Sequence, residues 1–214
     1  WICYLLKDMK KVKNILAIGA HPDDIEFGCG GTLLKESDSG SNIYMIVASA
    51  GGKGGNVVTR LTEQKTAADM IKTKGLFLAQ FRDTNILFNS DLIGYIEDKI
   101  NEIKPDKIYV NSKHDSHQDH VNLALATIAA SRYSTRVLFY ETYSSMNFNP
   151  YIFSDISNVI DKKIKVLESH ESQVKKFRPE KVGLVNGIKS IAVYRGFQIG
   201  VQYAEGFEVL KFLL

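Results

Sequence analysis

Cysteine is scarce in this sequence. Only two of its 214 residues, Cys3 and Cys29, are cysteines, and they form no Cys-x-x-Cys pair. So few cysteines exclude a disulfide framework, and without a Cys-x-x-Cys pair a thiolate metal site has no basis. The low count fits a reducing compartment, so we expect a cytoplasmic protein.

Long apolar runs and a strong excess of one charge are also missing. The apolar runs have the length of strands, well below the roughly 20 residues of a membrane-spanning helix. The formal net charge is only +3, and the lysines are scattered rather than gathered into the basic stripe typical of nucleic-acid binding. We therefore expect neither a spanning segment nor a nucleic-acid partner.

The length and composition are typical of one globular domain. The chain is 44% hydrophobic and 24% charged, and 214 residues can bury a large core. No linker, internal repeat or low-complexity segment divides it, so we expect a single domain over residues 1–214. The first methionine is Met9, which makes residues 1–8 a possible N-terminal extension. Assembly into a homo-oligomer is compatible with such a domain.

Strand-length apolar segments alternate with segments of helical length. We expect strands over residues 14–19, 42–48, 76–81, 107–110, 137–140 and 207–212. We expect helices over residues 27–36, 59–74, 90–103, 121–131, 158–169 and 187–198. Such alternation implies parallel strands joined by right-handed crossovers. The predicted fold class is α/β, a three-layer α/β/α sandwich around a Rossmann-like, mainly parallel sheet.

Polar segments follow three of the predicted strands. "HPDD" at residues 21–24 leaves the first strand, "SAGGKGGN" at 49–56 leaves the second, and "HDSHQDH" at 114–120 follows the strand at 107–110. Parallel strands end at one edge of the sheet, and ligands of open α/β folds bind there. The sequence therefore predicts that these segments form one site.

Two histidines and an aspartate of these segments are candidate ligands of one Zn²⁺ ion. His21 and Asp24 are three residues apart and can hold an ion across a turn. His120 is the better third candidate, because it lies where the second loop enters a helix. Catalytic zinc usually keeps three protein ligands with nitrogen or oxygen donors and an open position.

Three other residues of the same two motifs are candidates for proton transfer. Asp23 cannot easily turn the same way as Asp24, so it is free to act as a base on a metal-bound water. His117 suits proton donation or stabilisation of an oxyanion, and Asp119 would hold it and raise its pKa.

Each of these features also has a plainer interpretation. An Asp-Asp pair is usually a solvated turn, and an isolated His-x-x-His usually has no ligand. The glycines at 28, 30 and 31 can serve close packing of a helix on a sheet, and their spacing is a poor dinucleotide fingerprint. Together, however, the two polar clusters favour a metal site.

The same motifs resemble those of a known family. "AHPDDIEFGCGG" with "HQDH" is similar to the His-Pro-Asp-Asp-x-Glu and His-x-Asp-His signatures of the LmbE-like, or PIG-L-like, zinc-dependent N-deacetylases, and Glu26 fills the last position of the first signature. Weaker similarity continues in "TRLTEQKTAADMI", "VLFYET", "SHESQ" and "YAEGFE". The resemblance implies a Rossmann-like fold, one zinc ion, and hydrolysis of an acetamide on a glucosamine-type sugar.

Carried over position by position, the resemblance implies a role for each motif residue. The metal ligands would be His21, Asp24 and His120, the general base Asp23, and the general acid or oxyanion stabiliser His117 with Asp119 as its partner. Arg60 stands where the family has an arginine near the substrate, and Glu63 would orient it. A tyrosine that some members carry just upstream of the second motif has no counterpart here, so a tyrosine that assists the reaction would have to come from elsewhere.

Two other functions stay open at this point. A metal-dependent phosphoesterase usually requires two metal ions, and we count ligands for one. A non-catalytic zinc- or sugar-binding protein of the same fold would need neither Asp23 nor His117. What the resemblance implies is an N-deacetylase whose substrate is a small molecule or glycoconjugate with an N-acetylglucosamine moiety and an undetermined aglycone, and we predict that function.

Overall fold

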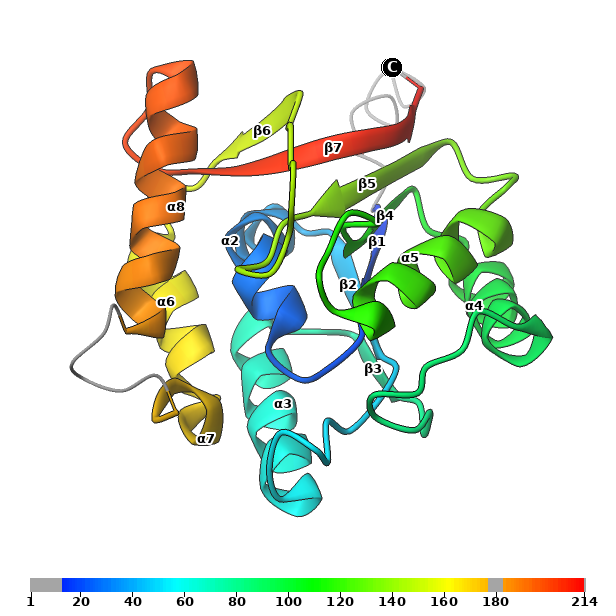
Figure 1. Ribbon diagram of the computed structural model, residues 1–214. Helices are drawn as coiled ribbons and strands as arrows, with labels where there is room; N and C mark the ends of the chain where they lie inside the picture. The colour runs from blue at the N-terminus through cyan, green and yellow to red at the C-terminus, as the bar shows by residue number, and fades with distance from the viewer. Residues whose placement is uncertain (1–12, 177–182, 214) are drawn as a thin grey trace, which may run out of the picture.

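A seven-stranded sheet organises the described residues, 13–176 and 183–213, of this computed structural model (Figure 1). The strand order is β3-β2-β1-β4-β5-β7-β6. Five neighbouring strands are parallel: β1 (Asn14–Gly19), β2 (Asn42–Val47), β3 (Gly75–Leu78), β4 (Lys107–Asn111) and β5 (Arg136–Tyr140). The possible extension at residues 1–8 lies outside the described residues.

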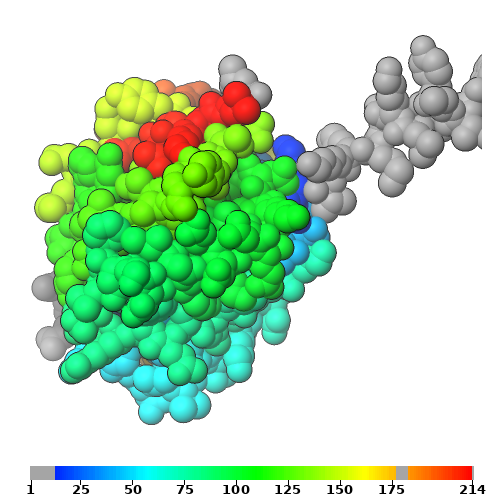
Figure 2. Space-filling view, turned by 90° about the vertical axis from the view of Figure 1, so that its right-hand side faces the viewer, coloured from blue at the N-terminus to red at the C-terminus, as the bar shows by residue number. Residues whose placement is uncertain are grey.

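Helices cover both faces of this sheet (Figure 1). One face packs against α2 (Asp24–Asp38), α3 (Val57–Ile71), α6 (Ile160–Glu168) and α8 (Leu184–Ile199), with the short α7 (Glu171–Val174) beside α6. The other face packs against α4 (Ser90–Ile103) and α5 (Gln118–Ala130). Figure 2 looks onto this second side, where the green side chains of α4 and α5 form the surface.

Alternate residues of β1 serve the two cores. Ile15 and Ala17 pack on the α2 and α3 side, whereas Leu16 and Ile18 pack on the α4 and α5 side. All four are fully buried, because successive side chains of a strand point to opposite faces and both faces of this sheet are covered. The three-layer α/β/α prediction is therefore confirmed.

The last third of the chain differs from the sequence prediction. The final strand, β7 (Ala204–Phe212), runs antiparallel to β5, and a strand that we did not predict, β6 (Ile152–Asp155), pairs with it at the edge. The four residues of β6 are partly exposed, so they lack the continuous apolar run that marks the central strands. The short helix α7 also went unpredicted.

None of the helices in residues 13–176 and 183–213 combines the length and the apolar content that a membrane crossing requires.

Candidate metal centre and active site

The first motif occupies the turn between β1 and α2. Asp23 adopts a left-handed backbone conformation with a φ of 94°, which aspartate tolerates better than most residues. The next residue, Asp24, begins α2, and its Oδ2 accepts a hydrogen bond of 2.9 Å from the backbone N–H of His21. Because the backbone turns at Asp23 before the helix starts, the carboxylates of Asp23 and Asp24 have different surroundings.

His21, Asp24 and His120 come together as the sequence predicted. One donor atom from each of these buried side chains lies within 4.8 Å of the others. Oδ2 of Asp24 is 3.2 Å from Nε2 of His120 and 3.6 Å from Nδ1 of His21. Two imidazole nitrogens and a carboxylate oxygen are a donor set that zinc prefers.

Each histidine has a second ring nitrogen, here called its outer nitrogen: Nε2 in His21 and Nδ1 in His120. Further carboxylates contact both of these nitrogens. Nε2 of His21 lies 3.2 Å from Oδ2 of Asp119 and 3.1 Å from Oδ1 of Asp83. Nδ1 of His120 lies 3.2 Å from Oδ2 of Asp115. Histidines that bind metals commonly present their second nitrogen to a carboxylate, which fixes the orientation of the ring.

These contacts give the centre a strong preference for positive charge. Burial alone lowers the pKa of His21, but Asp119, Asp24 and Asp83 outweigh it and raise the pKa to about 11. For His120 burial likewise lowers the pKa, and Asp24 and Asp115 raise it to about 10. Carboxylates that favour protons on both imidazoles also favour a divalent cation in place of those protons.

Asp23 lies in a different environment from Asp24. Burial and the charge of Asp24 raise the pKa of Asp23 to about 6, while Arg60 and His170 act in the opposite direction. Nη2 of Arg60 is 3.7 Å from Oδ2 of Asp23. A carboxylate with a pKa close to neutrality can both accept and return a proton at working pH.

Arg60 is buried and holds the backbone rather than presenting a free guanidinium. Its Nη1 donates to the carbonyl oxygen of Gly51 and its Nη2 to that of Pro22, both at 2.7 Å. The arginine therefore positions the turn that carries Asp23. Glu63, which was expected to orient Arg60, accepts hydrogen bonds of 2.7 Å from the backbone N–H and the hydroxyl of Ser172.

His117 caps the N-terminus of α5. Its Nδ1 accepts a 3.2 Å hydrogen bond from the backbone N–H of Asp119, so a neutral ring carries its proton on Nε2. Burial and the charges of His21 and His120 lower the pKa of His117, and Asp119 raises it by a smaller amount. The ring stacks on that of His120 with 4.8 Å between their centroids.

The Asp119 carboxylate points to His21, although the sequence suggested His117 as its partner. Besides its contact with His21, it accepts hydrogen bonds from the backbone N–H groups of Thr84 (2.7 Å) and Ile86 (3.1 Å). Asp119 thus touches His117 through its backbone and His21 through its side chain.

Asp83 was not predicted from the sequence, and Asp115 had no predicted role. Asp83 follows β3, a further parallel strand that ends at the same edge as β1, β2 and β4. The position of an acidic residue after a strand at this edge is the signal that could have found it. Oδ1 of Asp83 contacts His21, and Oδ2 accepts a 2.6 Å hydrogen bond from the backbone N–H of Lys53.

A cleft of about 450 Å³ opens onto this centre. Such a volume lies within the range of small-molecule sites, about 300–1,000 Å³. Tyr143 lines the cleft and packs edge-on against Phe27, with 5.8 Å between ring centroids. The other lining residues are His21, Asp23, Asp24, Lys53, Gly54, Arg60, Asp83, Thr84, His117, His120, Gln173 and Lys176.

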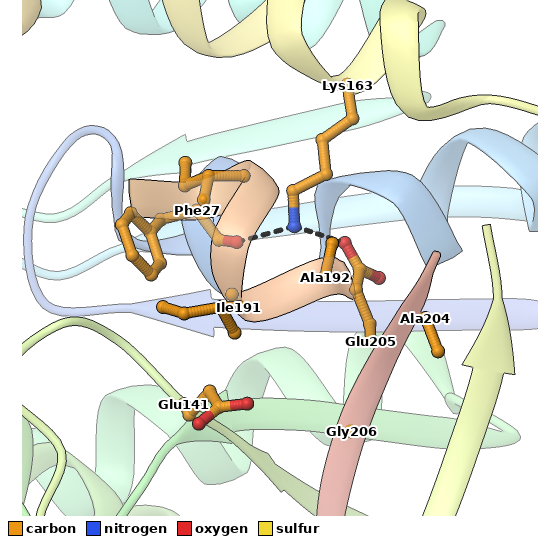
Figure 3. A pocket seen from close by; sticks show the side chains of 10 residues that line it. Phe27, Glu141, Lys163, Ile191, Ala192, Ala204, Glu205 and Gly206 are labelled. Atoms are coloured by element: carbon orange, nitrogen blue, oxygen red, sulfur yellow. Dashed lines mark hydrogen bonds and ion pairs between the residues drawn. The ribbon is translucent and has the colours of Figure 1, made fainter. Parts of the chain in front are cut away.

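Two of the three glycines after the first motif, Gly28 and Gly31, serve close packing, as their plainer interpretation predicted, whereas a Cβ on Gly30 would make only ordinary contacts at 3.9 Å. A Cβ on Gly28 would lie 2.1 Å from the ring of Tyr140, and one on Gly31 would lie 2.9 Å from Ile156. Next to them, Lys163 donates to the carbonyl oxygen of Phe27 at 2.7 Å and to Glu205 (Figure 3). This buried ion pair anchors the helix whose first residue is Asp24.

Comparison with known proteins agrees with this geometry. Residues 16–131 match the PIG-L family, described as GlcNAc-PI de-N-acetylase. The chain belongs to the PIG-L family. Its resemblance to this family and the expected hydrolysis of N-acetyl amide bonds are thereby confirmed.

Relatives of this PIG-L family protein include enzymes named as deacetylases. It is 34% identical over 177 residues to the uncharacterized deacetylase YaiS of Escherichia coli, covering 78% of this chain and 96% of that one. It is 28% identical over 228 residues to the diacetylchitobiose deacetylase of Thermococcus kodakarensis, covering 91% and 82%. The conserved protein TT1542 of Thermus thermophilus has the same fold, with a TM-score of 0.86 at 23% identity and coverage of 95% and 97%.

Proposed function

We propose that this PIG-L family protein is a zinc-dependent deacetylase that removes the acetyl group from an N-acetylglucosamine unit of a sugar or glycoconjugate. The observation that carries the proposal is the convergence of His21, Asp24 and His120 in a cleft that also contains Asp23. The relative from Thermococcus kodakarensis, a diacetylchitobiose deacetylase, supports the sugar class.

In this proposal the zinc ion is held by Asp24 and the two histidines. When bound, zinc supplies a Lewis acid for the amide carbonyl and for water. The carboxylates of Asp83, Asp115 and Asp119 orient the histidine rings through their outer nitrogens. Together with Asp24, these three are the carboxylates that contact His21 and His120 within residues 13–176 and 183–213.

Asp23 is the general base. Its carboxylate accepts a proton as water attacks the carbonyl carbon of the acetamide, and Arg60 keeps it in place. The C–N bond then breaks, and the leaving nitrogen needs a proton to depart as an amine. The proton held by Asp23 can meet this need, so that one water and one acetamide become acetic acid and a free amine, which exchange a proton to give acetate and an ammonium ion.

His117 stabilises the oxyanion. From the sequence, Asp119 was expected to raise the pKa of His117. The surroundings lower the pKa of His117, which favours a neutral ring that donates from Nε2. A neutral donor aimed at a developing oxyanion still lowers the barrier.

The described residues favour one metal over two. The second group of potential ligands, His21, His117 and Asp119, shares His21 with the first, so in residues 13–176 and 183–213 no independent second set accompanies it. This sharing argues against a two-metal phosphoesterase. The cytoplasmic location and the homo-oligomer stay predictions from the sequence.

The test is release of acetate from a panel of N-acetylglucosamine glycosides by the zinc-loaded protein and by His120→Ala. We expect release by the wild type, and loss of both zinc and activity in the variant. Zinc binding without acetate release would favour a binding protein, and release of phosphate from phosphate esters instead would favour the phosphoesterase.

A further inference from the structure

Tyr143 differs from the other residues that line the cleft at the candidate metal centre. Among the described lining residues it alone has a large apolar side chain, since the others are histidines, charged or amide side chains, a threonine and a glycine. It comes shortly after β5, a parallel strand that ends at the same edge of the sheet as β4. Exposed tyrosines are common, and Tyr133 is another in this chain, so its place in the cleft is the feature to explain.

The loop that carries Tyr143 is fixed through the carboxylate of Asp115. Oδ2 of Asp115 accepts hydrogen bonds from the hydroxyls of Thr142 at 3.0 Å and of Ser145 at 3.1 Å. The same oxygen lies 3.2 Å from Nδ1 of His120. One carboxylate therefore sets the position of this loop relative to a candidate metal ligand.

Backbone hydrogen bonds connect the same loop to the second motif. The N–H of Ser116 donates to the carbonyl oxygen of Ser144 at 3.1 Å, and the N–H of Met146 donates to that of His114 at 2.8 Å. Together with the two hydroxyl contacts, these bonds hold residues 142–146 against the segment that contains His117 and His120.

The ring of Tyr143 has a firm support. It packs edge-on against Phe27, with 5.8 Å between the centroids and 69° between the ring planes, and Phe27 is a buried residue near the start of α2. At the other end of the ring, partial burial of the hydroxyl group and the charges of Asp23 and Asp24 raise the pKa of the phenol. The ring therefore extends from α2 toward the carboxylates of the first motif.

We propose that Tyr143 is a specificity-determining residue whose aromatic ring packs against a face of the pyranose ring that carries the acetamide. The proposal rests on the proposed deacetylase function and deepens it: the site selects acetamides borne on a sugar ring over acetamides on an open chain. The hydroxyl and acetamide groups of N-acetylglucosamine lie around the rim of its ring, and the two faces carry C–H groups. An aromatic side chain offers these faces a large apolar surface, while the polar lining residues suit the rim.

The experiment compares two substrates that share one aglycone. The first is the N-acetylglucosamine glycoside that the wild type deacetylates fastest in the panel. The second is the 2-acetamidoethyl ether of the same aglycone, which keeps the acetamide and its two-carbon link to the oxygen but has no pyranose ring. The measured quantity is kcat/KM for acetate release by the zinc-loaded full chain.

The variants separate the aromatic ring from its hydroxyl group. Tyr143→Ala should lower the ratio of glycoside to ether kcat/KM about fivefold or more, as for the loss of an aromatic contact. The loss should be a higher KM for the glycoside at a nearly unchanged kcat, because a contact with the sugar ring exists equally in the ground state and the transition state. Tyr143→Phe keeps the ring and should restore most of the affinity that Tyr143→Ala loses.

Tyr133→Ala is the matched control. It removes an exposed tyrosine outside the cleft and should leave the ratio and the KM unchanged. Zinc content and thermal unfolding of all variants establish that each is folded and loaded.

Three results would overturn the proposal in distinguishable ways. An unchanged KM for the glycoside in Tyr143→Ala would reject the contact with the sugar ring and leave the deacetylase intact. A fall of kcat in both Tyr143 variants would assign the phenol hydroxyl a part in the reaction and would reject the role of the ring. Absence of acetate release from every glycoside of the panel would reject the deacetylase itself, and the inference with it.

Discussion

Nε2 of His21 lies 3.2 Å from Oδ2 of Asp119, so a side chain of the first motif is oriented by a side chain of the second. The same carboxylate accepts the backbone N–H groups of Thr84 and Ile86. Asp119 therefore connects three segments at the sheet edge, and its main role in this structure concerns His21 more than His117.

Replacing Asp119 with asparagine should weaken zinc binding by about 10–100-fold, as for other partners of metal-binding histidines. The asparagine keeps the shape but loses the charge that orients His21. Competition with a chelator measures the affinity. Asp98→Asn, at an exposed position of α4, is the matched control and should bind zinc as the wild type does. If the variant binds zinc as tightly as the wild type and the basic limb of its pH–rate profile is shifted, this prediction is wrong. Asp119 then acts on His117, as the sequence suggested.

Asp23→Asn should keep its zinc and lose activity. Asp23 is 3.7 Å from Arg60 and does not belong to the candidate metal-ligand group His21, Asp24 and His120. General bases contribute about 10²–10⁴-fold to the rate, so kcat should fall by that order. Acetate release and metal content are measured on the same sample. Turnover near the wild-type rate in zinc-loaded Asp23→Asn would remove Asp23 from the mechanism.

Gly28→Ala should destabilise the protein by about 1–3 kcal/mol, as overpacking of a core does. The new Cβ would lie 2.1 Å from the ring of Tyr140, whose hydroxyl is fixed by a 2.9 Å hydrogen bond to the carbonyl oxygen of Ile18. Gly94→Ala, in α4 with no atom within 4 Å of the new Cβ, should instead stabilise by up to about 1 kcal/mol. Chemical denaturation of both variants is the measurement, and equal stabilities would contradict this packing.

His170 should make the stability of the protein depend on pH. The ring is fully buried, and its Nε2 lies 3.5 Å from Oε2 of Glu26. Burial lowers its pKa, but Glu26, Asp23 and Glu63 outweigh it, so the folded pKa lies above the unfolded value. The stabilisation is therefore complete below the unfolded pKa of about 6.5 and disappears as pH rises through the folded pKa.

The measurement for His170 is the difference in unfolding free energy between the wild type and His170→Gln at a series of pH values. The difference should be largest at pH values below about 6.5 and should shrink at higher pH. A difference that grows with pH would mean that the ring is neutral in the folded protein.

The three candidate metal ligands could be predicted from the sequence because the signal for each of them is local. Imidazole and carboxylate side chains follow the apolar strands β1 and β4, and parallel strands end at one edge. The same reasoning did not extend to Asp83, since the residues after β3 form no motif. It also missed β6, a short edge strand whose residues are only partly buried.

The direction of individual side chains was the part that the sequence could not determine. Whether the Asp119 carboxylate turns to His117 or to His21 depends on the backbone N–H groups of residues 84 and 86, which come from a distant segment. The contact between Gln173 and Gly54 likewise depends on how α7 packs against residues 51–56, which follow a different strand.

In the proposed function, one zinc ion held by His21, Asp24 and His120 makes this protein an N-deacetylase. The most direct measurement is a titration of the metal-free protein with zinc while acetate release from an N-acetylglucosamine glycoside is followed. Activity should rise in proportion to added zinc and level off at about one ion per chain. Absence of acetate at every zinc ratio, or activity that appears only with a second ion, would contradict the account.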